Sequence, residues 1–128
     1  MTPLTLTPGA ATLDDLARIY REEAAVKLDP AYRPAIELAH ARIAKAVAGA
    51  DAVYGKTHRF GMEIPVKIAS DDTATLQRNL ILSHCCGVGP AIPRGHARLL
   101  MALKLLSLGR GASGARLEAA DLIEAMLD

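Results

Sequence analysis

Apolar positions recur along the chain at intervals that predict a mainly helical protein with a small β component near its start. Leu4 and Leu6 alternate with threonines, which predicts a short strand that ends at Pro8-Gly9. Beyond it, apolar residues at helical spacing predict five helices, over about residues 13–24, 30–48, 70–86, 93–108 and 117–128.

Several of these helices carry start signals of their own. Thr12 precedes Asp15 by three residues, the spacing of a capping box with Asp in place of Glu. Asp29 supplies an N-cap carboxylate before a proline at the first helical position. Ser70 or Asp71 is expected to cap the third helix, which should run to about residue 86 and end at a Gly-Val-Gly turn.

The last third of the chain is the most apolar part. The leucines of the fourth helix, at positions 99, 100, 103, 105, 106 and 108, wrap most of its circumference. A helix that is apolar all round is either buried on all sides or lacks a partner. Because the last two helices carry more leucine than a small monomer can hide, we expect this chain to associate with itself or with a partner.

Composition supports the helical prediction and limits the function. Apolar residues make up 51% of the chain and aromatic residues only 3%, so the core must be built from Leu, Ala, Ile and Val. Alanine and leucine favour helices, while the aromatic residues that favour strands are scarce. The net charge of +1 gives no electrostatic footprint for nucleic acid or for an anionic membrane.

The sequence is typical of a cytoplasmic protein. Its longest apolar stretch is about half the ~20 residues that a bilayer requires, and its start does not have the pattern of a secretory signal. Cys85 and Cys86 are adjacent, a spacing that rarely permits a strain-free disulfide. We interpret both as small buried hydrophobic residues; a zinc site with His84 is disfavoured because adjacent helical side chains point about 100° apart.

Two residues at the ends of irregular segments are candidates for proton transfer. Tyr54 opens a loop over about residues 52–68, and His84 lies just before the Gly-Val-Gly turn. Long loops in compact domains are often functional, and both residue types exchange protons, although packing or capping would also explain them. The Glu22-Glu23 pair is interpreted as a solvated helix end rather than as a catalytic dyad.

Three segments resemble motifs of one enzyme family. Residues 75–89 read Thr-Leu-Gln-Arg-Asn-Leu-Ile-Leu-Ser-His-Cys-Cys-Gly-Val-Gly and resemble the Leu-Gln-x-Asn-Leu-x-x-Ser-His signature of histidine ammonia-lyases. Residues 53–61 resemble the family's Tyr-Gly-x-Asn-Thr-Gly-Phe-Gly loop, and residues 107–118 resemble its Asn-Ser-Leu-Ala-Arg-Gly-x-Ser-Gly-x-Arg-Pro-Glu stretch. The chain therefore resembles the amino-terminal portion of the histidine and aromatic amino-acid ammonia-lyases.

The resemblance implies elimination of ammonia from an amino acid, most simply histidine to urocanate. The family's electrophile, methylidene-imidazolone, forms when a backbone Ala-Ser-Gly cyclises and loses water, and it acts as the electron sink that this elimination needs. By position, Tyr54 matches the family's acid/base tyrosine and His84 the histidine that lines its substrate pocket. Gly55, Phe60 and Gly61 match the loop around that tyrosine.

Two departures from the family pattern affect this expected site. Thr57-His58-Arg59 stand where the family has Asn-Thr-Gly, which removes a flexible glycine and adds bulk and charge beside Tyr54. Ala112-Ser113-Gly114 is the tripeptide that cyclises in the family, but here it lies in the family's helix-start motif. We therefore interpret this tripeptide as a helix start in which Ser113 caps the last helix, and not as the precursor of the cofactor. We expect no cofactor-forming residue and no metal site in this chain.

The expected architecture is one amino-terminal lyase-like domain over residues 1–128. It should comprise a loop-and-helix part over about 1–92 and the start of a central helical bundle over about 93–128. The resemblance implies that complete enzymes of the family are several times longer than this chain and tetrameric, with active sites assembled from three subunits. We expect part of a histidine ammonia-lyase-like enzyme that is inactive alone and acts with copies of itself or with a complementary lyase chain. The alternative is a non-catalytic assembly or regulatory module that binds a full-length lyase.

Overall fold

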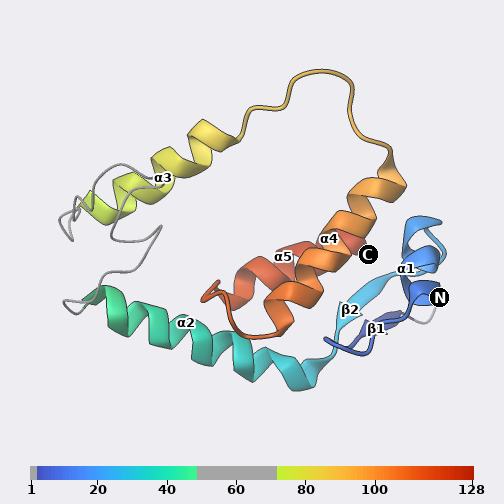
Figure 1. Cartoon of the computed structure of the whole chain (residues 1–128), viewed down its shortest axis with the longest axis horizontal. Coiled ribbons are helices and arrows are strands. Elements are labelled where there is room, and N and C mark those ends of the chain that lie inside the picture. Colours follow the sequence, from blue (N-terminus) through green and yellow to red (C-terminus); the bar gives the residue numbers. More distant parts are fainter. Residues whose placement is uncertain (1–2, 49–71) are drawn as a thin grey trace. The chain divides into compact units, whose positions relative to one another are not determined.

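The computed structural model describes residues 3–48 and 72–128. Helices dominate the described chain, and two short strands near its start form the β component (Figure 1), so the predicted fold class is confirmed. The elements are β1 (Leu4–Leu6), α1 (Leu13–Tyr20), β2 (Val26–Leu28), the 3-10 helix η1 (Pro30–Tyr32), α2 (Arg33–Ala48), α3 (Thr73–His84), α4 (Arg94–Gly109) and α5 (Leu117–Leu127).

The chain divides into two compact units. Met1–Ala41 and Ala91–Asp128 form the first, and Arg42–Pro90 form the second. The first unit contains both strands, α1, the start of α2, α4 and α5, whereas the described part of the second contains the end of α2 and α3. The expected division near residue 92 stays a prediction. None of the described helices is long and apolar enough to cross a membrane.

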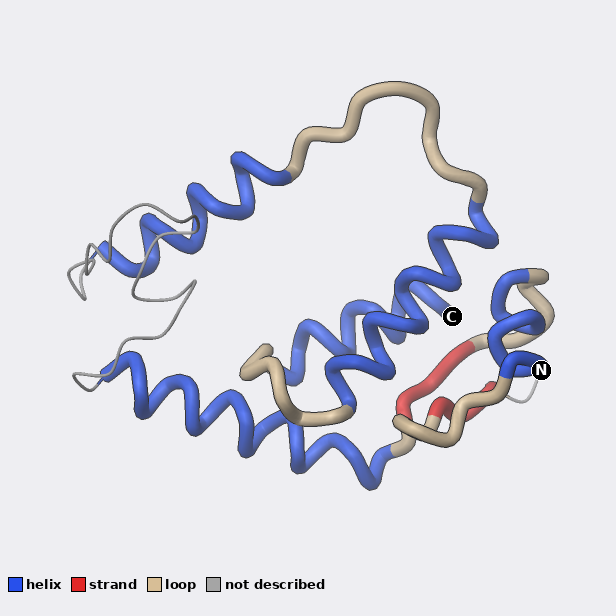
Figure 2. The backbone as a smooth tube through the Cα atoms, in the orientation of Figure 1, coloured by secondary structure: helices blue, strands red, loops and turns tan. Residues whose placement is uncertain are grey.

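The two strands pair in parallel, with Leu4 opposite Val26 and Leu6 opposite Leu28 (Figure 2). Because alternate residues of a strand face the same side, Leu6, Val26 and Leu28 all lie buried in the core. The strand at the start of the chain was predicted, but its partner β2 was not. Three residues of apolar-polar-apolar sequence are too short a signal to be distinguished from a loop.

α1 begins as predicted and ends earlier than predicted. The Thr12 side chain accepts a hydrogen bond from the Asp15 amide, and the Asp15 carboxylate accepts one from the Thr12 amide, so the capping box is present. The helix ends at Tyr20 rather than near residue 24, because Glu22 adopts a left-handed conformation with φ of 63°. Glu22 and Glu23 are exposed, which confirms the interpretation of a solvated helix end.

α4 lies at the centre of the first unit, where it contacts α1, α5 and β2. Its buried face presents Ala102, Leu105 and Leu108 to a core completed by the strands and by Ile19, Ile36, Ala120 and Leu127. On the opposite face Leu100 is 60% exposed and Leu103 is 43% exposed. The leucines that wrap α4 are therefore divided between a buried face and a face left open.

Candidate functional site

Most of the site expected from the sequence lies outside the described residues. This applies to Tyr54 and to its loop partners Gly55, Phe60 and Gly61, as well as to the departure at Thr57-His58-Arg59. Their predicted roles stay predictions. The described part of the site is therefore the end of α3, where His84 lies.

α3 begins and ends a little inside its predicted limits. Its first residue is Thr73, with Asp72 at the N-cap position and no side-chain cap hydrogen bond. The cap expected at Ser70 or Asp71 lies outside the described residues. The helix ends at His84 rather than near residue 86, and the amide of Cys85 closes it by donating to the Ile81 carbonyl at 2.9 Å.

The His84 ring is held by the last turn of its own helix. Its Nδ1 lies 2.8 Å from the Leu80 carbonyl oxygen and 3.1 Å from the Ser83 hydroxyl oxygen. A carbonyl can only accept, so Nδ1 carries the proton and donates to Leu80. In the neutral ring the lone pair is then on Nε2, and the exposed His84 side chain can offer that nitrogen to a ligand.

The two cysteines after His84 contradict their predicted role as buried hydrophobic residues. Both thiols are free, and both residues are exposed. Since α3 ends at His84, neither cysteine lies on a helix face that could pack against a core. Within residues 3–48 and 72–128 no group of His, Cys, Asp and Glu is arranged to hold a metal ion.

Ala112-Ser113-Gly114 lies in the connection between α4 and α5, and it does not cap α5 in the way expected. The N-cap residue of α5 is Arg116, and its side chain makes no capping hydrogen bond. The Ser113 hydroxyl instead accepts from the Ala115 amide at 3.4 Å, within the turn that precedes the helix. Gly114 is buried with φ of 68°, so the chain turns at a glycine three residues before the start of α5, and the predicted cap at Ser113 is wrong.

A side chain from α2 holds this turn in place. His40 Nδ1 lies 3.1 Å from the Gly114 carbonyl oxygen and donates to it. Ala112 and Ser113 are both exposed to solvent. A methylidene-imidazolone needs a site from which water is excluded, because the electrophile would otherwise be solvated and quenched. These residues do not fit that group.

One ion pair links α2 to α5 beside the turn. Arg33 donates to the Asp121 carboxylate, and its Nη1 lies 3.8 Å from a Glu124 oxygen. The hydrogen bond to Asp121 raises the pKa of Arg33 above its ordinary value. This pair was not singled out in the sequence, because its members are 88 residues apart.

The family assignment follows from comparison of the whole chain. Residues 11–128 match the family model described as aromatic amino acid lyase. The chain belongs to the aromatic amino acid lyase family. The resemblance found in the three motifs is therefore confirmed. Because the match extends over both compact units, residues 49–71 and the described helices belong to one lyase sequence.

Two solved structures have the same fold. The X-ray structure of a tyrosine aminomutase from Streptomyces globisporus matches 98% of this chain with a TM-score of 0.89 and 24% identity. A tyrosine aminomutase mutant with a bound ligand matches 98% of this chain with a TM-score of 0.88 and 23% identity. This chain spans 24% of the length of each of those chains. The described elements thus correspond to part of a longer lyase fold.

Proposed function

We propose that this chain is the amino-terminal part of an ammonia-lyase that eliminates ammonia from an amino acid, with histidine as the favoured substrate. Tyr54 would serve as the acid/base residue and His84 would bind the substrate. The family match over residues 11–128 supports the lyase assignment. The arrangement of His84 is the observation that carries its role, because a ring fixed through Nδ1 leaves Nε2 for a substrate.

Activity would require lyase sequence outside residues 1–128. The family's methylidene-imidazolone supplies an electrophile that makes the β-proton of a bound amino acid acidic. The Ala112-Ser113-Gly114 turn does not fit this group, and the chain spans 24% of the matched structures. The electrophile would therefore come from lyase sequence outside residues 1–128, and these residues alone would bind but not convert an amino acid.

Complementation tests this proposal. The purified chain is mixed with a longer polypeptide from a histidine ammonia-lyase that begins after the region matched here, and urocanate formation is followed by its absorbance. We expect turnover in the mixture and none with either chain alone. Turnover of tyrosine but not of histidine would contradict the proposed substrate and leave the lyase assignment in place. Turnover by the isolated chain would contradict the proposal that the electrophile comes from outside this chain.

Variants of α3 test the role of His84 in that mixture. His84→Ala should lower kcat/KM about tenfold, which corresponds to the loss of one hydrogen bond of roughly 1.4 kcal/mol to the substrate. Tyr54→Phe should lower kcat about 100-fold, the usual effect of losing an acid/base group. Arg78→Gln is the matched control, because Arg78 is an exposed residue of the same helix and is expected to leave both parameters unchanged. An unchanged kcat/KM in His84→Ala would contradict the proposed role.

The second candidate function is an assembly module that binds a full-length lyase without joining its chemistry. Open apolar side chains on the last two helices favour it, because Leu100 on α4 is 60% exposed and Leu122 and Met126 on α5 are 62% and 58% exposed. Under this hypothesis the chain should co-elute with an intact lyase, and Tyr54→Phe in this chain should leave turnover unchanged. If Tyr54 instead serves as the acid/base residue of the active site, the same substitution reduces turnover.

A further inference from the structure

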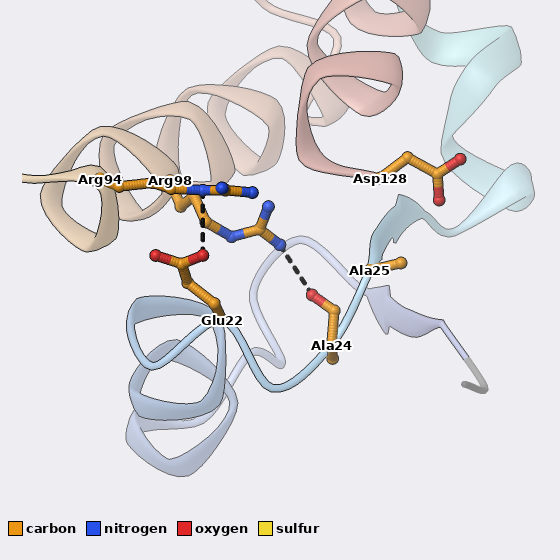
Figure 3. A pocket seen from close by; sticks show the side chains of 6 residues that line it. All are labelled: Glu22, Ala24, Ala25, Arg94, Arg98 and Asp128. Atoms are coloured by element: carbon orange, nitrogen blue, oxygen red, sulfur yellow. Dashed lines mark hydrogen bonds and ion pairs between the residues drawn. The ribbon is translucent and has the colours of Figure 1, made fainter.

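The two arginines that line a surface pocket of about 310 Å³ in the first unit already have partners (Figure 3). Arg98 Nη2 donates to the Ala24 carbonyl at 2.8 Å and to the Leu127 carbonyl at 2.9 Å. Arg94 Nε lies 2.9 Å from the Glu22 carboxylate. Contacts within the fold therefore explain both guanidinium groups, and the side chains that still need an explanation are the two cysteines after α3.

Cys85 and Cys86 follow α3 directly, and neither thiol contributes to the core. Both thiols are free, and both residues are exposed. The Cys86 Sγ lies 3.7 Å from the Ser83 carbonyl oxygen, which is a weak contact because a thiol is a poor donor. Adjacent cysteines rarely close a strain-free disulfide, so we expect the pair to stay reduced and available to a ligand.

The end of α3 at His84 removes the geometric objection to a shared ligand. Successive side chains of a helix point about 100° apart, which keeps neighbouring thiols from meeting at one atom. Cys85 has left the helix, with φ of −81° and ψ of 47°. The pair therefore lies on irregular backbone, where rotation about the χ1 bonds of the two residues suffices to bring both sulfur atoms to one ligand atom.

We propose that Cys85 and Cys86 form a chelating site for a trivalent arsenical with one carbon substituent. Such an arsenic atom needs only two further bonds, and it prefers soft thiolate ligands. A zinc ion would need more protein ligands, and no group of three His, Cys, Asp or Glu in residues 3–48 and 72–128 is arranged to supply them. In the reaction two S–H bonds and the As=O bond break, two As–S bonds form, and the oxygen leaves as water with both protons. Neither arsenic nor sulfur changes its oxidation state.

Intact-mass analysis of the reduced full chain with phenylarsine oxide tests the proposal. Because the first As–S bond places the second thiol at a high effective concentration, we expect one phenylarsenic group per chain. This adduct should persist in excess 2-mercaptoethanol and be removed by 1,2-ethanedithiol, since only a dithiol competes with a chelate. Removal by both reagents with equal ease would indicate single-thiol bonds and overturn the proposal. The chain contains no other cysteine, so every thiol-bound arsenic reports on this pair.

Substitutions of the pair separate chelation from ordinary thiol binding. Cys85→Ser and Cys86→Ser should each weaken the binding of phenylarsine oxide about 100-fold, because each leaves a single thiol without the gain from a joined second one. Cys86→Ser combined with Thr75→Cys is the matched control, since it keeps two exposed thiols but separates them by about 14 Å of helix rise. This variant should bind as weakly as the single substitutions. Binding as tight as that of the unchanged chain in any of the three variants would overturn the proposal.

Discussion

The Leu28 amide donates a hydrogen bond of 2.8 Å to the buried carboxylate of Glu124, although the two residues lie 96 positions apart. β2 pairs with β1 on one side, and Glu124 of α5 satisfies a backbone donor of the same strand. Only 8% of Glu124 is exposed, and its other oxygen faces Arg33. This side chain therefore connects the small sheet, α2 and α5 in one buried polar contact.

Glu124 should consequently be a sensitive position for stability. Glu124→Ala leaves the Leu28 amide without its acceptor, and an unsatisfied buried donor costs about 1–3 kcal/mol. Glu124→Gln keeps an acceptor oxygen and should cost less. Urea unfolding followed by circular dichroism measures both variants. Equal losses in the two variants would show that charge, and not the hydrogen bond, is the important property of Glu124.

Gly111 should not tolerate a side chain. Its φ is 65°, and a Cβ built there would lie 2.7 Å from the Ala35 carbonyl oxygen. Gly111→Ala combines left-handed strain of about 1–2 kcal/mol with this clash, so we expect a loss of at least that size in thermal or urea unfolding. Gly87→Ala is the matched control, because nothing lies within 4 Å of a Cβ at that position. A neutral Gly111→Ala would mean that the turn after α4 differs from the one described.

The core of the first unit should depend strongly on Leu105. This leucine has no exposed surface, and its replacement by alanine leaves a cavity that α1, α5 and β2 cannot fill. Leu105→Ala should lower the free energy of unfolding by about 2–5 kcal/mol. Leu103→Ala removes the same atoms from the open face of α4, where 43% of the residue is exposed, and should cost much less. Similar losses in both variants would contradict the division of α4 into two faces.

Acid should weaken the start of α1. Hydrogen bonds from the Thr12 hydroxyl and then from the Thr12 amide lower the pKa of Asp15. A carboxylate whose pKa is lower in the folded than in the unfolded protein stabilises the fold at pH values above its unfolded-state pKa of about 3.9. This stabilisation is lost as the pH falls through the folded-state pKa. Thr12→Ala should therefore raise the pKa of Asp15 in a carboxyl-carbon titration by NMR. Thr12→Ser retains the hydroxyl and should leave that pKa lowered.

Local signals account for the parts of the fold that could be predicted. The capping box at Thr12 and Asp15 and the cap at Asp29 depend on residues a few positions apart, and the sequence displays them directly. β2 and the burial of Arg98 depend on distant partners, such as the Ala24 carbonyl 74 residues from Arg98. Hydrophobic spacing contains no information about such pairs.

The family could be predicted from the sequence, whereas the geometry around the candidate site could not. The three motifs led to the correct family, because their order along the chain is specific. Ser113 was wrongly assigned as a cap, since the left-handed Gly114 places the turn between it and α5. The exposure of Cys85 and Cys86 could not be inferred from their apolar character, because it depends on where α3 ends.

We expect that this chain, although it carries lyase sequence, does not form the lyase electrophile from Ala112-Ser113-Gly114. The mass of the intact purified chain, followed by mass analysis of the proteolytic peptide that contains Ser113, tests it most directly. Cyclisation of the tripeptide removes water and lowers the mass, whereas an ordinary turn leaves it unchanged. We predict the mass calculated from the sequence, with an unmodified peptide. A peptide lighter by the loss of water at these residues would show that the tripeptide cyclises and would contradict the turn described for it.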